Sequence, residues 1–237
     1  MKKILAMMLT AVMTLSLLTA CGKEKEVKID VDQPQNAATV DEPAYLGTRA
    51  EAVEDSRNVN GKRFTSTLYD FTSRYNAEMS LRGEKDVIHM EGWKKNGQVT
   101  KDENGIRIQY YYYDDNGMNI TATVEEDSDK LVNIGCGTTM GHFVGKEDNG
   151  EKKSDKILLR AALVAQAVCG YPSGHVNTLQ NIFYRVTEEN KNLWYDGFVF
   201  ALNTREDGAD SQNSLMLFRV FPVTDKLKEE WHLEEYQ

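Results

Sequence analysis

Apolar residues recur at helical spacing in three stretches of the chain. In the first stretch they are Leu68, Phe71, Tyr75 and Met79. Thr67 and Asp70, where this stretch begins, have the spacing of a capping box, in which each residue satisfies a free backbone N–H of the other. Gly83 follows its end. The pattern therefore predicts a helix over about 68–80.

The second stretch, over about 155–169, is apolar around most of its circumference, which predicts a largely buried helix. Gly170 and Pro172 are placed to end it. A third helix is predicted from about 177, with one buried stripe formed by Leu179, Ile182, Phe183 and Val186. Residues 225–236 are compatible with a further short helix.

Alternating apolar and polar residues, typical of strands, lie between the helical stretches. The clearest case is residues 105–127, where Asn116-Gly117 is the turn signal of a hairpin between two runs rich in β-branched and aromatic residues. Four further strands are predicted: 87–95, 130–139, 193–203 and 214–222. The order is helix, meander, two helices, hairpin. The predicted fold is α+β, an antiparallel sheet with helices packed on one face.

The N-terminal residues have the pattern of a secretory signal peptide. Lys2 and Lys3 precede an uncharged, mostly apolar run over 4–18, which is short for a membrane span. The run ends in Leu18-Thr19-Ala20-Cys21, which resembles the lipobox of bacterial lipoproteins. The resemblance implies cleavage before Cys21 and attachment of a diacylglyceryl group to its thiol. An uncleaved N-terminal anchor is the alternative.

The chain is then expected to have three parts. Residues 1–20 form the signal peptide, 21–60 the lipidated cysteine and a flexible polar tether, and 61–237 a single α+β domain. The formal charge is −9, and loss of the two lysines with the signal peptide leaves −11. An acidic protein is an improbable partner for nucleic acid, and an anionic membrane repels it, so the lipid must provide the anchor. The expected location is the outer face of the cytoplasmic membrane.

Two seven-residue stretches resemble each other, "CGTTMGH" at 136–142 and "CGYPSGH" at 169–175. Cys136, His142, Cys169 and His175 are residue types that bind zinc, but the spacing within each stretch does not fit a zinc finger. Cys136 and Cys169 are also candidates for a disulfide, because the expected compartment is oxidising. The remaining interpretation is two small core residues beside glycine turns. No metal or cofactor is assigned.

Four consecutive tyrosines, Tyr110 to Tyr113, lie in the first strand of the predicted hairpin. Alternate residues of a strand face opposite sides of the sheet. Ile106 and Ile108 share a face with Tyr110 and Tyr112 and have the character of core residues, so Tyr111 and Tyr113 are predicted to be the exposed pair. An exposed tyrosine pair is a candidate contact surface for a protein, peptide or glycan, and a purely structural role is the alternative.

Established sequence signatures of enzymes are missing from the chain, including the nucleophile elbow and the HExxH zinc motif. The favoured hypothesis is a lipid-anchored, non-enzymatic extracytoplasmic domain that binds a protein, peptide or envelope component through its sheet. A hydrolase acting on the envelope or on nutrients is the alternative, with His142 or His175 beside a carboxylate. A solute-binding lipoprotein is a second alternative, disfavoured because such proteins need two α/β lobes.

Overall fold

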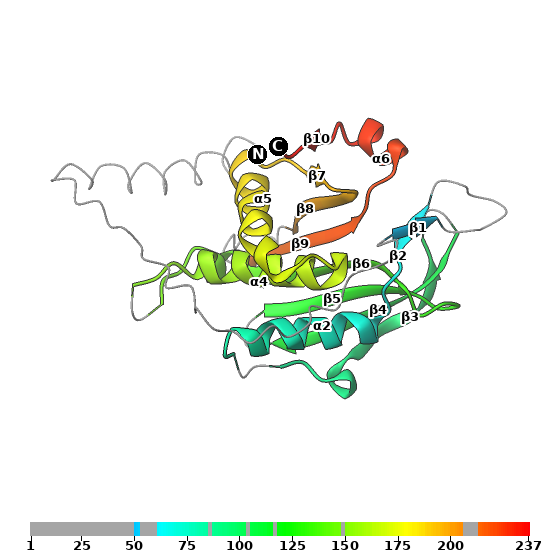
Figure 1. Ribbon diagram of the computed structural model, residues 1–237, viewed down its shortest axis with the longest axis horizontal. Helices are drawn as coiled ribbons and strands as arrows, with labels where there is room; N and C mark the ends of the chain where they lie inside the picture. The colour runs from blue at the N-terminus through cyan, green and yellow to red at the C-terminus, as the bar shows by residue number, and fades with distance from the viewer. Residues whose placement is uncertain are drawn as a thin grey trace. The chain divides into compact units, whose positions relative to one another are not determined.

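The computed structural model (Figure 1) describes residues 50–52, 61–84, 87–102, 105–115, 118–147, 150–205 and 213–237. The predicted signal peptide, Cys21 and the Asn116-Gly117 turn lie outside these residues. Among the described residues, no helix has the length and apolar character that crossing a membrane requires.

An eight-stranded, almost entirely antiparallel sheet forms the centre of the fold. Its strand order is β10-β7-β8-β9-β6-β5-β4-β3, and the short β10–β7 pair is parallel. The strands are β3 (Lys94–Lys101), β4 (Arg107–Asp115), β5 (Met118–Glu125), β6 (Leu131–Thr139), β7 (Leu193–Tyr195), β8 (Phe198–Arg205), β9 (Leu215–Pro222) and β10 (Glu234–Glu235). The α+β class is therefore confirmed.

Three long helices cover one face of the sheet: α2 (Leu68–Leu81), α4 (Lys153–Cys169) and α5 (Val176–Glu189) (Figure 1). Their apolar residues and those of the facing strands form the main core. Phe183 of α5 illustrates the packing, since its ring meets Phe200 of β8 and Phe218 of β9 edge-on, with ring centres 5.5 and 5.6 Å apart. Short helical segments complete the chain: η1 (Met90–Gly92), α3 (Met140–Phe143), η2 (Ser173–His175) and α6 (Asp225–Glu230).

The three predicted long helices are confirmed, and their ends follow the local chemistry. Thr67 and Asp70 form the capping box: the backbone N–H of Asp70 donates to Thr67 Oγ1 at 3.1 Å, and that of Thr67 donates to Asp70 Oδ2 at 2.9 Å. Gly170 ends α4 in the left-handed conformation, with φ +66°, which glycine adopts without steric cost. The predicted stripe of α5 is buried in full.

The predicted hairpin of residues 105–127 is confirmed, because β4 and β5 pair antiparallel with Asp115 opposite Met118. The predicted strand over 87–95 is wrong: η1 occupies Met90–Gly92, and β3 starts only at Lys94. Gly92 is the last residue of η1, and the ring of Tyr113 lies where a Cβ of this residue would be. A side chain at this position would force that ring to move.

Residues 193–203 were predicted as one strand and form two. Asp196 and Gly197, both with positive φ (47° and 88°), make a tight turn between β7 and β8. This is the backbone that a two-residue hairpin turn requires, and Asp-Gly is one of its preferred sequences. The consequence is an additional strand, which moves the sheet edge to β7 and β10.

A small two-stranded sheet precedes α2. Its strands are β1 (Ala50–Ala52) and β2 (Lys62–Phe64), paired antiparallel with Ala50 opposite Phe64. Phe64 is fully buried and its ring stacks on that of Phe198. Ala50–Ala52 lie within the segment predicted as a tether, so part of that segment pairs with the folded domain.

Candidate functional site

The structure reverses the predicted faces of the tyrosine strand. Tyr111 and Tyr113 are partly buried and pack against the main core, on the face covered by helices. Tyr110 is 43 % exposed on the opposite face, which Tyr112 shares because the two alternate with Tyr111 and Tyr113. The proposed contact pair Tyr111 and Tyr113 is thus not the exposed pair.

The error came from Ile106 and Ile108, whose predicted burial is correct. They are 6 % and 3 % exposed, but they form a small separate cluster with Val132 on the face away from the long helices. A second cluster lies on the same face around Val199 and Phe221. Burial of the isoleucines therefore did not identify the helix-covered face.

The C-terminal segment covers the second of these clusters. Leu227 and Leu233 pack against it, and the ring of Trp231 meets that of Phe221 edge-on at 5.7 Å. The ammonium group of Lys228 lies 3.6 Å from the centre of the Trp194 ring. α6 thus lies on the opposite face, whereas the three long helices share one face as predicted. The middle of this face lies between the two clusters.

The middle of the face is a row of paired residues across five strands. Tyr112 of β4, Thr121 of β5, Gly135 of β6, Arg219 of β9 and Ala201 of β8 are consecutive partners in the register. Directly paired residues of a sheet project to the same side. We use the name open-face strip for the large side chains in and beside this row: Tyr110, Tyr112, Leu215, Leu217 and Arg219.

Gly135 leaves room for the Arg219 side chain, which packs beside it. A Cβ at Gly135 would overlap the carbonyl oxygen of Phe218 and would come within 3.2 Å of Cγ of Arg219. The guanidinium carbon of Arg219 lies 5.4 Å from the centre of the Phe221 ring, within the range of a cation–π contact. Burial lowers the pKa of the Arg219 guanidinium, and the Tyr110 hydroxyl opposes that shift.

Arg219 has no ion-pair partner among the residues that the structure describes. Two other cations near this sheet have an ion-pair partner: Arg63 pairs with Glu125, and Lys94 pairs with Asp114 at 3.1 Å. A partly buried charge without a counter-ion is costly unless something compensates it. The strip therefore combines exposed aromatic and aliphatic groups with one uncompensated positive charge.

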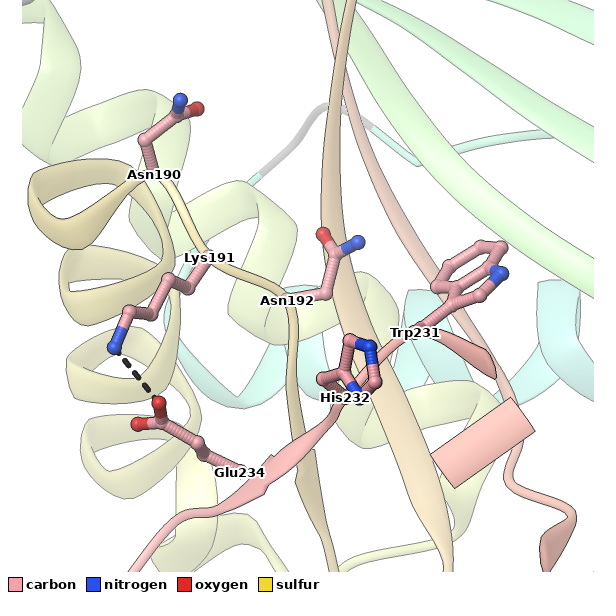
Figure 2. Close-up of a pocket in the computed structure, with 6 residues that line it drawn as sticks. All are labelled: Asn190, Lys191, Asn192, Trp231, His232 and Glu234. Carbon is pink, nitrogen blue, oxygen red and sulfur yellow. Dashed lines mark hydrogen bonds and ion pairs between the residues drawn. The ribbon is translucent and has the colours of Figure 1, made fainter. Parts of the chain in front are cut away.

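A pocket of about 370 Å³ lies at the edge of the sheet, between the end of α5 and the C-terminal segment. Figure 2 shows its lining residues: Asn190, Lys191, Asn192, Trp231, His232 and Glu234. Lys191 and Glu234 form an ion pair of 2.7 Å across it. This pair raises the pKa of Lys191 and lowers that of Glu234, so the pocket neutralises its own charges. Its charged groups are satisfied, unlike Arg219.

The four residues of the two similar stretches do not form a metal site. Within the described part of the chain, no group of three or more His, Cys, Asp or Glu side chains is arranged to hold a metal ion. Cys136 lies in β6 and His142 in the short helix α3, whereas Cys169 ends α4. The ring of His175 stacks on that of Tyr171, with 5.3 Å between centres. The stretch 136–142 therefore begins within a strand, whereas the stretch 169–175 begins at the last residue of a helix.

Cys136 and Cys169 are both buried and are not joined in a disulfide. The candidate bridge is therefore not formed in this structure. Cys136 is paired in register with Ile120 and Phe218, so its thiol belongs to the apolar core between sheet and helices. Burial raises the pKa of Cys136 to about 12. Both cysteines act as small core residues.

Among the described residues, neither His142 nor His175 forms an ion pair with a carboxylate or a hydrogen bond with a serine side chain. The hydroxyl of Ser173 donates to Glu78 of α2 at 2.7 Å, and its neighbour His175 stacks on Tyr171 instead. The backbone N–H of His142 donates to Thr139 Oγ1 at 3.3 Å, as in a helix cap. A nucleophile must lie within hydrogen-bond reach of its base, and neither contact provides such a pair.

Arg219 and Gly135 are the site residues that the sequence prediction missed. The alternation of β9 contained the signal, because Leu215, Leu217 and Arg219 recur at every second position. Gly135 interrupts a strand, which often marks a close backbone approach.

The chain matches no protein-family model, and comparisons with curated proteins and with solved structures give no match.

Proposed function

We propose that this protein is a lipid-anchored, non-enzymatic binding module on the outer face of the cytoplasmic membrane, which contacts an envelope component through its open-face strip. The observation that carries the proposal is the composition of the strip. Tyr110 and Leu215 are 43 % and 49 % exposed and lie beside an arginine without a counter-ion. Tyr and Arg are the residues most enriched where proteins bind other proteins.

The lipobox supports the anchored location. Cys21 would carry the lipid, and two acyl chains give stable anchoring because each buried CH₂ contributes about 0.8 kcal/mol. The expected charge of −11 after cleavage would make electrostatic membrane binding unfavourable. A Cys21→Ala variant should accumulate as precursor or leave the membrane fraction. If this variant is still cleaved and still sediments with membranes, the anchor is not a lipid on Cys21.

Binding through the strip is tested with purified envelope fractions. The wild-type chain and the variants Tyr110→Ala and Tyr112→Ala are incubated with detergent-solubilised envelope, and the bound components are quantified. Each variant should lose roughly tenfold or more in recovery, because aromatic residues central to an interface contribute most of its affinity. Tyr69→Ala is the matched control, since Tyr69 is 66 % exposed on α2. Equal recovery by all four proteins would refute the proposal.

A further inference from the structure

Arg219 lies in the middle of the open-face strip and is its one charged member, while two further cations, Lys94 opposite Tyr112 and Arg205 opposite Leu215, flank the strip on the same face. Its side chain packs beside Gly135, and its guanidinium carbon lies 5.4 Å from the centre of the Phe221 ring. A cation–π contact of this kind restrains the side chain, and the planar guanidinium keeps N–H donors that can pair with an anion. We propose that the strip binds a polypeptide partner that places a carboxylate side chain against Arg219. This inference rests on the proposed function.

Charge complementarity indicates that the partner group bound by the Arg219 guanidinium is a carboxylate. No described carboxylate lies within ion-pair distance of the guanidinium, although the chain carries a net charge of −9. Arg107, by contrast, meets both Glu126 and Asp127 at the border of the sheet. A planar guanidinium pairs with a carboxylate through two parallel hydrogen bonds, which gives direction as well as affinity.

The surroundings of Arg219 favour a polypeptide over an anionic polymer. A phosphate polymer is bound by several cations at once, which makes its affinity strongly dependent on salt. Of the other cations on this face, Lys94 opposite Tyr112 is already paired with Asp114, and Arg205 lies at the border opposite Leu215. Arg219 is therefore the one cation among the strip's two tyrosines and two leucines. Leu215 is 49 % exposed, so apolar side chains of a partner would find apolar contacts there. Aromatic and apolar groups around a single arginine are typical of the centre of a protein interface.

The same charge disfavours a second copy of the chain as the occupant. In a symmetric dimer formed by this face, Arg219 would approach its own counterpart or a neighbouring tyrosine, because the strip contains no carboxylate and Asp114, beside Tyr112 on the same face, is already paired with Lys94. The acidic net charge of both copies would add repulsion. The partner must therefore supply the negative charge.

The test uses the full chain reconstituted in lipid nanodiscs and a displayed library of random 16-residue peptides as the probe. Peptides are selected on the wild-type protein. The peptide that binds most tightly is then synthesised. A set of variants of it is also made, each with a single Asp changed to Asn or a single Glu changed to Gln. We expect selected peptides enriched in Asp or Glu beside apolar residues. One acid-to-amide change should weaken binding at least tenfold.

The protein variants identify the contact made by that acid. Arg219→Gln should weaken binding of the original peptide at least tenfold. In this variant, the acid-to-amide change that weakens binding to the wild type should cause no further loss of affinity. Arg219→Lys, which keeps the charge but not the planar group, should give an intermediate loss. Lys156→Gln is the matched control, because it removes a positive charge from an exposed side chain of α4. Thermal unfolding shows that each variant is folded.

Several results would overturn the inference. Selected peptides without acids, or peptides that bind Arg219→Gln as tightly as wild type, would refute the carboxylate assignment. If Tyr110→Ala still lost binding in that case, the strip would remain the contact surface and only its chemistry would be wrong. A failure to select any peptide, competition by a polyphosphate chain alone, or concentration-dependent dimers abolished by Arg219→Gln would each exclude the polypeptide partner. The acid-to-amide comparison needs no protein variant, so a misfolded Arg219→Gln would not spoil the test.

Discussion

The ring of Trp93 meets the ring of Tyr113 edge-on, with 5.6 Å between their centres. Trp93 is buried, and its indole N–H donates to the hydroxyl of Thr72 in α2 at 3.1 Å. Tyr113 therefore belongs to the layer between the sheet and α2. Tyr110 lies on the other face, so neighbours in one strand have different physical roles.

Replacement of Tyr113 by Ala should lower the free energy of unfolding by about 2–4 kcal/mol, because it removes packing against Trp93 and leaves a cavity. Tyr110→Ala should cost less than about 1 kcal/mol, since its side chain is largely exposed. Urea unfolding of both variants measures the difference. Equal losses would mean that both faces of β4 are covered.

The capping box of α2 gives a second stability prediction. Thr67→Ala should lower the free energy of unfolding by about 1 kcal/mol, because the N–H of Asp70 loses its acceptor. Asp70→Ala should lower the free energy of unfolding by a similar amount. The double variant should lose less than the sum of the two single losses, since the hydrogen bonds are reciprocal. Ser73→Ala, at an exposed position of the same helix, is the control and should be neutral or slightly stabilising. Additive losses would contradict the reciprocal cap.

The helices were predictable because their signals are local. The cap of Thr67, the apolar stripe of α5 and the glycine after α4 each act within a few residues, and the structure confirms all three. The turn at Asp196-Gly197 was also local and was overlooked, although Asp-Gly between apolar residues is a strong hairpin signal. Its neglect merged two strands into one.

The site was harder to predict because it depends on long-range pairing. Alternation shows that Tyr110 and Tyr111 face opposite sides, but only the helices decide which side is covered. Arg219 joins the tyrosines because β9 pairs with β6, far apart in the sequence. No local pattern specifies that pairing, so the open-face strip emerged only from the assembled sheet.

The two core cysteines lead to a prediction about thiol reactivity. Burial raises the pKa of Cys136 to about 12, so very little of this thiol is ionised at pH 8, and only the thiolate reacts. The native protein should therefore react slowly with a thiol reagent at this position. After unfolding without reductant, two thiols should react if Cys21 carries lipid and three if it does not. Fewer than two would indicate that Cys136 and Cys169 are joined in a disulfide.

The ion pair between Lys191 and Glu234 leads to a prediction about pH. The hydrogen bond to Lys191 lowers the pKa of Glu234, so the pair's stabilising effect is present above the ordinary carboxyl pKa of about 4.3 and is lost as pH falls through the lowered value. The pKa of Lys191 is raised, so the effect is present below its ordinary pKa of about 10.4 and is lost as pH rises through the raised value. The attachment of β10 should therefore be tightest between these limits.

The side-chain carboxyl signal of Glu234, followed by NMR against pH, measures this interaction directly. In the wild-type protein its midpoint should lie below about 4.3, and in Lys191→Met it should return towards that value. The shift should also shrink in 1 M salt, where the screening length is about 3 Å and an exposed pair is strongly screened. Lys226→Met, which breaks the Lys226–Glu230 pair on α6, is the control and should leave the Glu234 midpoint unchanged. An unaltered midpoint in Lys191→Met would show that the pair with Lys191 does not lower the pKa of Glu234.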